Sequence, residues 1–218
     1  MPSIAPLFSD PDEFFSERVD DPSYKGPIAV MLLIGAIGSV STIIQFRAIY
    51  SLFTAMETDI PGTVITGISA ISFVFVLIGP FIGWLMWAGG FVLVSVFLDG
   101  NEDFSTTLAL VGWGFVPKIF SQLAALGLTY YQFEIRGVSV PENFTAESSQ
   151  QFVQQLTGGT VVVARTGITI LFLFWSAFIW YYAVQHSLEL DRRDAAITVA
   201  VPLLLAIVWN GQTLLTAL

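Results

Sequence analysis

Apolar residues in this chain are gathered into long runs, and short polar segments separate the runs. No charged residue occurs from residue 60 to 98 or from residue 195 to the end. An uncharged apolar run of about 18 or more residues can cross a bilayer as a helix. Applied along the chain, this criterion predicts five spans, at about residues 27–46, 62–98, 105–133, 162–185 and 195–217. The pattern therefore predicts an all-α polytopic membrane protein, a five-transmembrane-helix bundle.

The second apolar run is longer than one membrane crossing needs. Residues 60–98 would extend about 58 Å as a single helix at ~1.5 Å per residue, whereas the hydrocarbon core is ~30 Å thick. Gly79 and Pro80 lie near its middle. The run predicts either one long, kinked and tilted helix or a tight pair of short spans hinged at the proline. Gly79 and Gly83 also form a Gly-xxx-Gly pattern, for which we expect local helix packing rather than dimerisation.

The segment before the first run predicts a short amphipathic helix at the membrane interface. Asp10 suits the N-cap, Pro11 the first helical position and Glu13 a capping box. Phe14 and Phe15 give the helix an apolar side, and burial of these two rings would have to hold it at the interface.

The distribution of charge predicts the orientation. Lysine and arginine favour cytoplasmic loops, and with five spans they gather on the side of the N-terminus. That side holds Arg18, Lys25, Arg192 and Arg193, against Arg47 and Arg136 on the other side and Arg165 at its edge. The N-terminus has no basic signal peptide. We expect a cytoplasmic N-terminal segment (residues 1–26), a transmembrane domain (residues 27–218) in the cell membrane, and a C-terminus outside.

Composition supports this class and narrows the chemistry. The chain is 55% hydrophobic and 11% charged, with 17 acidic residues, eight basic residues and no cysteine. Acid-rich, lysine-poor polar segments are typical of proteins from salt-loving microbes, so we interpret the protein as halophilic. The absence of a basic patch argues against nucleic-acid binding. Without cysteine there is neither a thiol nucleophile nor a thiolate metal site.

Lys118 is the one charged residue between residues 104 and 133, and Pro117 precedes it. If the third span is centred on the whole run, the amine lies near mid-membrane, where a charge costs about 3 kcal/mol or more and needs a partner. If the span begins near Pro117, the amine lies close to the cytoplasmic surface and reaches towards it. We favour the second interpretation, because proline suits the first turn of a helix.

A few other polar residues are candidates for function or for helix packing. Asn210 and Gln212 in the last span, with Gln122 in the third, either line a polar path or bond to a neighbouring helix, which is the commoner role. Asn143 begins a glycosylation sequon in the longest polar stretch. His186, the only histidine, is interpreted as a solvated loop residue. No catalytic, cofactor or metal motif is evident, so we predict a protein that is not an enzyme.

Three segments together resemble the Yip domain family, named for Ypt/Rab-interacting proteins. The first is LFSDPDEFF, before the first span. The second is LDGNEDFSTTLALVGWGFVPKIFSQL, which leads into the third span, and the last is FLFWSAFIWYYAVQHSLELDRRDAAITVAV, towards the C-terminus. The resemblance implies a five-span bundle with a cytoplasmic N-terminus, association with other membrane proteins, and a part in membrane organisation or traffic. Members that act with Rab-type GTPases carry a long N-terminal segment, whereas about 26 residues precede the first span here. Rab binding is therefore not expected.

These observations favour a non-enzymatic membrane protein that acts by helix–helix association, as a homo-oligomer or an accessory subunit. One alternative is a transporter or channel for a small solute or ion, with a polar path near Lys118, Asn210 and Gln122. Another is lipid handling or bilayer shaping through Phe14 and Phe15.

Overall fold

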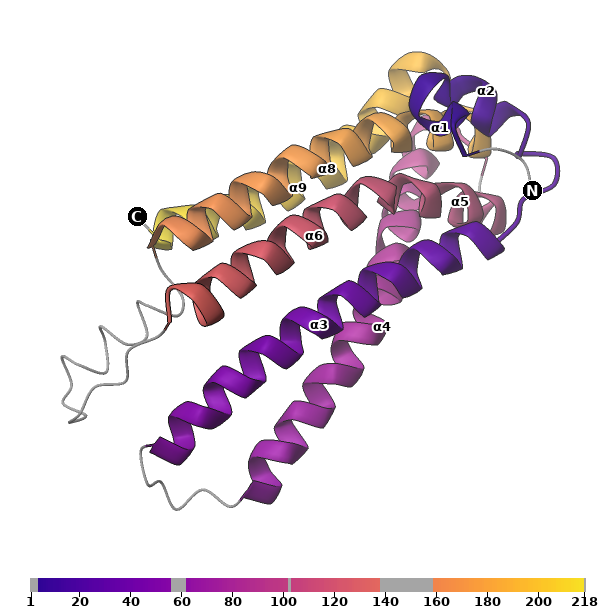
Figure 1. Cartoon of the computed structure of the whole chain (residues 1–218). Helices are drawn as coiled ribbons and strands as arrows, with labels where there is room; N and C mark the ends of the chain where they lie inside the picture. Colours follow the sequence, from indigo (N-terminus) through magenta and orange to yellow (C-terminus); the bar gives the residue numbers. More distant parts are fainter. Residues whose placement is uncertain (1–3, 56–61, 102, 138–158, 218) are drawn as a thin grey trace.

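The computed structural model describes residues 4–55, 62–101, 103–137 and 159–217, and most of this part of the chain is helical (Figure 1). The elements are α1 (Pro6–Ser9), α2 (Pro11–Ser16), α3 (Lys25–Ala55), α4 (Gly62–Ser95), η1 (Val96–Leu98), α5 (Phe104–Val111), η2 (Gly112–Phe115), α6 (Val116–Tyr130), η3 (Tyr131–Ile135), α8 (Gly159–Ser187) and α9 (Arg192–Ala217). The segments long and apolar enough to cross a membrane are Lys25–Ala48, Thr66–Leu98, Phe104–Ile135, Gly159–Ser187 and Arg192–Gln212. The predicted all-α, five-span architecture is confirmed.

Several helices extend past the predicted ends of their spans. Helix α3 continues to Ala55, whereas the first span was predicted to end at residue 46. Charged residues mark where a chain leaves the hydrocarbon, but a helix ends only where something breaks it. The sequence from Arg47 to Ala55 contains no glycine or proline. The helix therefore continues beyond the end of the predicted span.

Helix α4 decides between the two interpretations of the second apolar run. It is one continuous helix from Gly62 to Ser95, with Pro80 inside it. Proline is tolerated inside membrane-spanning helices because neighbouring groups satisfy the backbone that it frees. The alternative of two short spans hinged at Pro80 is excluded.

The third span is a chain of short helical segments rather than one regular helix. Helix α5 is followed directly by the 3₁₀ turn η2, then by α6 and the π-helical turn η3. Asp103 caps α5: its carboxylate accepts hydrogen bonds from Thr106 Oγ1 at 2.7 Å and Thr106 N at 3.0 Å. These bonds lower the pKa of the Asp103 carboxyl from its ordinary value. Pro117 lies in the first turn of α6, where its missing donor costs nothing.

The long helices contact one another in a closed order. Helix α3 packs against α4 and α6, α4 also contacts α9, and α8 contacts both α9 and α6. The two termini lie at opposite ends of the bundle (Figure 1), as an odd number of spans requires. The half of α4 that precedes Pro80 diverges from α9, so that the α3–α4 pair and the group α6, α8 and α9 separate towards the end that bears the C-terminus.

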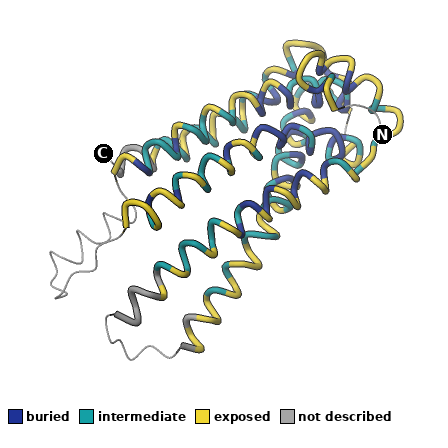
Figure 2. The backbone as a smooth tube through the Cα atoms, in the orientation of Figure 1, coloured by how far each residue is buried: buried dark blue, intermediate teal, exposed yellow. Residues whose placement is uncertain are grey.

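The buried core is concentrated at the opposite end, where α5 and the N-terminal helices lie (Figure 2). Its centre is an aromatic cluster of Trp87, Phe91, Phe115 and Trp180. The Trp180 ring stacks on Trp87 at 4.3 Å between centroids and meets Phe91 and Phe115 edge-on. Trp180 Nε1 donates to Val111 O at 3.0 Å. This bond satisfies a carbonyl in the last turn of α5, where the regular helix ends.

Two glycines allow the helices to approach closely at this end. A Cβ at Gly114 would overlap the Trp180 ring, and a Cβ at Gly112 would clash with Pro27 and the Trp84 indole. The indole of Trp84 donates to Leu108 O at 2.7 Å. The GWG sequence in η2 is therefore a contact point for three helices, because only a hydrogen fits between the backbone and the rings.

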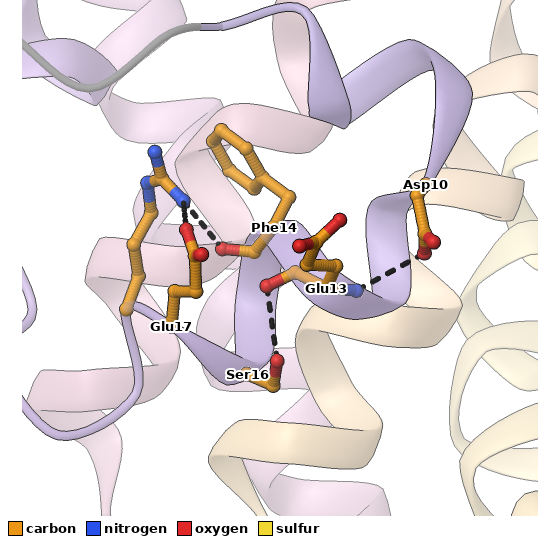
Figure 3. Close-up of polar contacts among 6 residues, drawn as sticks. Asp10, Glu13, Phe14, Ser16 and Glu17 are labelled. Atoms are coloured by element: carbon orange, nitrogen blue, oxygen red, sulfur yellow. Dashed lines mark hydrogen bonds and ion pairs between the residues drawn. The ribbon is translucent and has the colours of Figure 1, made fainter.

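The N-terminal helices are held by the protein's own core. The Asp10 carboxylate caps α2 by accepting from Glu13 N at 3.1 Å (Figure 3), as predicted. In a full capping box the Glu13 side chain would accept a hydrogen bond from Asp10 N. Here Asp10 N donates to Pro6 O instead, so only the first half of the predicted capping box is formed. Phe14 and Phe15 are 1% and 0% exposed. Burial does hold this helix, but the rings lie against protein rather than lipid.

Phe14 is covered from two sides. Its ring meets Trp113 of η2 edge-on at 5.3 Å, and the Arg18 guanidinium lies 3.7 Å above it. Arg18 also donates to Phe14 O at 2.7 Å and pairs with Glu17, contacts that Figure 3 shows. Helix α2 packs on α8. In this arrangement neither phenylalanine has a surface to insert into a bilayer, so bilayer shaping through these rings loses its basis.

Candidate functional site

A cavity of about 620 Å³ lies among the five long helices. This volume is typical of small-molecule binding sites. Its polar lining residues come from α3, α6, α8 and α9: Ser41, Thr42, Gln45, Lys118, Ser121, Gln122, Thr129, Arg165, Thr169, Ser176 and Asn210. These helices also contribute apolar residues such as Ile34, Phe172 and Leu173, and the wall formed by α4 is apolar, with Phe75, Val76 and Pro80. The aromatic cluster closes the cavity at the α5 end through Trp87, Phe115 and Trp180.

The cavity lies deep within the span, as the pairing of α6 with α8 shows. Thr107 Oγ1 donates to Ser187 Oγ at 3.2 Å, at the end of α8. Phe120 stacks on Trp175 and Phe172, near the middle of α8. Lys118 lies beside Phe120 in sequence, and therefore opposite the middle of α8 and not near its end.

Lys118 is exposed to this cavity. Its ammonium lies 5.7 Å from the centroid of the Phe115 ring, a weak cation–π contact at the closed end. The structure thus supports the interpretation that the sequence argument ranked second, in which the lysine lies within the span. The predicted role of Pro117 is compatible with this depth, because the first turn of α6 is itself inside the bundle.

A second cation, Arg165 of α8, lines the same cavity. Its Nη2 donates to Thr129 Oγ1 on α6 at 2.7 Å, whereas its buried Nε has no hydrogen-bond partner. Ser41 Oγ, on the α3 side of the cavity, is also buried and without a partner. Buried polar atoms are normally paired, and because both atoms are buried they are covered by other protein atoms and do not open onto the cavity.

The cavity carries positive charge that no lining carboxylate balances. Its described lining residues include Lys118 and Arg165 but neither aspartate nor glutamate. Within the described part of the chain the ion pairs are Arg18–Glu17 and His186–Asp12, both at the other end of the bundle. Lys118 and Thr129 are about 16 Å apart along α6 at ~1.5 Å per residue. The two cations therefore occupy different levels of one cavity.

The structure brings together three of the predicted polar residues. Lys118, Gln122 and Asn210 all line the cavity. Asn210 Nδ2 donates to Ala206 O of its own helix at 2.7 Å, whereas a bond to a neighbouring helix was expected. Gln212 is exposed and is not part of the lining. Asn143 lies outside the described residues.

Sequence reasoning missed Arg165, the residue that gives the cavity its second charge. Arg165 was assigned to the edge of the fourth span, because a charge usually marks a boundary. In the structure α8 begins at Gly159, so Arg165 lies in its second turn and contacts α6. The threonine Thr129 gave no signal in the sequence, since its role depends on the register between α6 and α8.

His186 also differs from its predicted role as a solvated loop residue. It lies in the last turn of α8, and its Nε2 is 2.7 Å from Asp12 Oδ1 of α2. The contact ties the N-terminal helices to the bundle. Among the described residues, no group of three or more histidine, aspartate and glutamate side chains is placed to hold a metal ion.

Comparisons with known proteins agree with this architecture. The family model of the Yip1 domain matches residues 6–210. An uncharacterized protein of Methanocaldococcus jannaschii is 29% identical over 134 residues, which cover 61% of this chain and 92% of that protein. No solved structure matches at a significant level. The match extends from α1 through all five spans, and the chain therefore belongs to the Yip1 domain family.

Proposed function

We propose that this Yip1 domain protein binds an anionic ligand in the cavity at the centre of its transmembrane bundle. The observation that carries the proposal is that Lys118 and Arg165 line one cavity without a lining carboxylate. A cation inside a span is costly and usually has a functional role. At about 16 Å and an effective dielectric constant of ~20, the two cations repel each other by about 1 kcal/mol. An anion would relieve this repulsion and accept hydrogen bonds from the Lys118 ammonium. Binding of this kind needs no catalytic step.

The test uses an amphiphilic anion and its neutral counterpart. Purified protein in a neutral detergent is titrated with decyl phosphate or decanol while thermal unfolding is monitored. A ligand that binds only the folded state raises the unfolding midpoint. We expect decyl phosphate to raise it more than decanol does. A charge-assisted hydrogen bond contributes about 1.5–3 kcal/mol, so Lys118→Met and Arg165→Gln should each weaken binding by roughly 10- to 100-fold.

Matched variants separate charge at the cavity from charge elsewhere. Arg47→Gln removes one positive charge from an exposed position that does not line the cavity, and it should leave binding unchanged. Lys118→Arg keeps the positive charge and should therefore retain most of the binding that Lys118→Met loses. Equal binding of decyl phosphate by wild type, Lys118→Met and Arg165→Gln would refute the proposal.

Transport is a direct extension of this binding. The aromatic cluster lines the cavity at the α5 end, so a transported anion would have to leave by another path or after a rearrangement of this cluster. Uptake of a labelled anion into liposomes, compared between wild type and Lys118→Met, would reveal a carrier. Absence of flux in wild type would limit the function to binding.

Association with other membrane helices is a second candidate, and helix α4 favours it. Of the best membrane-spanning window of Thr66–Leu98, 6% is buried inside the protein. A Cβ at Gly83, which does not line the cavity, would meet no atom within 4 Å, so another helix could approach there closely. Crosslinking in native lipid, followed by mass spectrometry, should yield a homo-oligomer or an accessory complex. A monomer without partners under those conditions would count against this candidate.

A further inference from the structure

We propose that the anionic ligand is a bilayer lipid with a phosphate headgroup, which enters the cavity sideways between α4 and α9. This inference rests on the function proposed above and adds the ligand class and its route. It is argued from the surfaces of α4 and α9, the apolar and polar parts of the lining, and the two lining cations.

The opening lies on the side of the bundle that faces hydrocarbon. Helices α4 and α9 touch near Gly90 and Pro202, where a Cβ on the glycine would be 3.9 Å from the proline ring. Beyond this contact the half of α4 that precedes Pro80 and the C-terminal half of α9 diverge (Figure 1). Phe75 of α4 lines the cavity and is 66% exposed, so its ring is not covered by other parts of the protein. A ligand dissolved in the bilayer can therefore reach the cavity without crossing water.

Apolar side chains flank this opening on both helices. On α9, Leu205 and Trp209 are 70% and 76% exposed, directly beside the lining residues Ala206 and Asn210. Acyl chains can lie against these surfaces while a headgroup reaches the polar wall on α6 and α8. A free aqueous anion would use the polar wall and leave the apolar wall without a partner. The two-sided lining thus fits an amphiphile better than a soluble ion.

The donor set fits phosphate oxygens. The Lys118 ammonium and the Gln122 amide both belong to residues that line the cavity, and Arg165 adds a second positive charge to the lining. Phosphate offers several strong acceptor oxygens and one negative charge in a diester, and it forms short charge-assisted hydrogen bonds with such groups. Because Lys118 and Arg165 lie at different levels, a single phosphate contacts one of them directly and is attracted to the other at longer range. Loss of either positive charge should therefore weaken its binding.

Native mass spectrometry of the purified protein tests the ligand class. The protein is titrated in neutral detergent with phosphatidylglycerol and with phosphatidylcholine of the same acyl chains, whose choline cation the site repels. We expect phosphatidylglycerol to bind at least 10-fold more tightly. Lys118→Met and Arg165→Gln should each weaken this binding about 10-fold, and the double variant should abolish the preference. Lys118→Arg should retain it, and Arg47→Gln should match wild type.

A blocking label tests the route, because the chain contains no cysteine and an introduced one reacts alone. Ala206→Cys places a bulky maleimide at the cavity opening, whereas Leu205→Cys places it on the outer face of the same helix. Labelling at position 206 should reduce phosphatidylglycerol binding at least 10-fold, and labelling at position 205 should have no effect. Equal binding by both labelled proteins would overturn the lateral route.

The outcomes distinguish this inference from the function on which it rests. If decyl phosphate binds through Lys118 and Arg165 but phosphatidylglycerol shows no preference over phosphatidylcholine, the lipid assignment is wrong and the proposed function stands. If inorganic phosphate displaces decyl phosphate at equal concentration, the site takes an aqueous anion and the inference is likewise overturned. If no anion binds in a manner that depends on the two cations, both proposals fail.

Discussion

The two ends of the helix bundle are built from the same five spans but are packed in opposite ways. At the α5 end, Trp180 is 2% exposed, its ring is surrounded by other aromatic rings, and its indole nitrogen bonds to a backbone carbonyl. At the other end the helices diverge around a cavity that is lined by two cations and by hydroxyl and amide side chains. Stability is thus concentrated in one half of the molecule, which leaves the other half free to hold charge that a tightly packed protein would exclude.

This difference shows where a small membrane protein can accommodate a charged site that destabilises the folded state. Buried cations without partners are destabilising, so they need a scaffold that tolerates the cost. The closed end supplies that scaffold by anchoring α3, α4, α6, α8 and α9 against α5 and the N-terminal helices. Substitutions at the two ends should consequently change stability in opposite directions.

The largest effect is expected at the centre of the closed end. Trp180→Ala should lower the free energy of unfolding by about 3–5 kcal/mol, because it leaves a cavity in the aromatic cluster and an unpaired Val111 carbonyl. Thermal unfolding in detergent measures the change. Trp209→Ala, at a position that is 76% exposed, should have little effect. Similar losses in both variants would contradict the claim that stability lies at this end.

The close approach at Gly114 should give the next largest effect. Gly114→Ala should cost about 1–3 kcal/mol, because the new methyl group overlaps the Trp180 ring and the surrounding helices have little freedom to move. Gly127→Ala is the matched control on α6, since a Cβ there meets no atom within 4 Å. It should be neutral or stabilise the helix by up to about 1 kcal/mol. Urea or thermal unfolding of both variants would show the contrast.

The open end should respond in the opposite direction. Lys118→Met should stabilise the ligand-free protein by about 1 kcal/mol, because it removes the repulsion between the two cations. The same variant should lose the stabilisation that decyl phosphate gives to wild type. Unfolding midpoints with and without the anion measure both effects. A loss of stability in the ligand-free variant would mean that Lys118 has a structural partner and that the cavity is not a site of uncompensated charge.

The N-cap of α5 should give the smallest effect and a dependence on pH. Asp103→Ala should cost about 1 kcal/mol at neutral pH, as is usual for the loss of a cap. Hydrogen bonds from Thr106 lower the pKa of this carboxyl from its ordinary value of 3.8. The ionised cap therefore stabilises the folded state above the unfolded-state pKa, and this contribution is lost as the pH falls below about 3.8 through the lowered folded-state pKa.

Asp103→Asn separates the charge from the cap. Asparagine can still accept the hydrogen bond from Thr106 N, so the variant should keep most of the stability at neutral pH. It should also lack the acid-dependent part. An identical acid profile in wild type and Asp103→Asn would show that another carboxyl controls the response.

Much of this architecture could be predicted from the sequence alone. The five spans follow from uninterrupted apolar runs, because a charge in hydrocarbon is expensive wherever the helix packs. The Asp10 cap followed from local spacing, since an N-cap involves residues three apart in sequence. Lys118, Gln122 and Asn210 were recognised as candidates because a polar side chain inside an apolar run is conspicuous by itself.

Only the tertiary structure decided what those residues face. The direction of Lys118 depends on the level at which α6 lies against α8, and contacts such as Phe120 with Trp175 fix that level. Arg165 became a cavity residue because α8 begins before it, and Phe14 became a core residue because Trp113 covers it. The sequence by itself determined which segments enter the membrane, because that cost is local to each residue. Which side chains share a cavity depends on contacts between residues far apart in the chain, and only the packing of the five helices determined it.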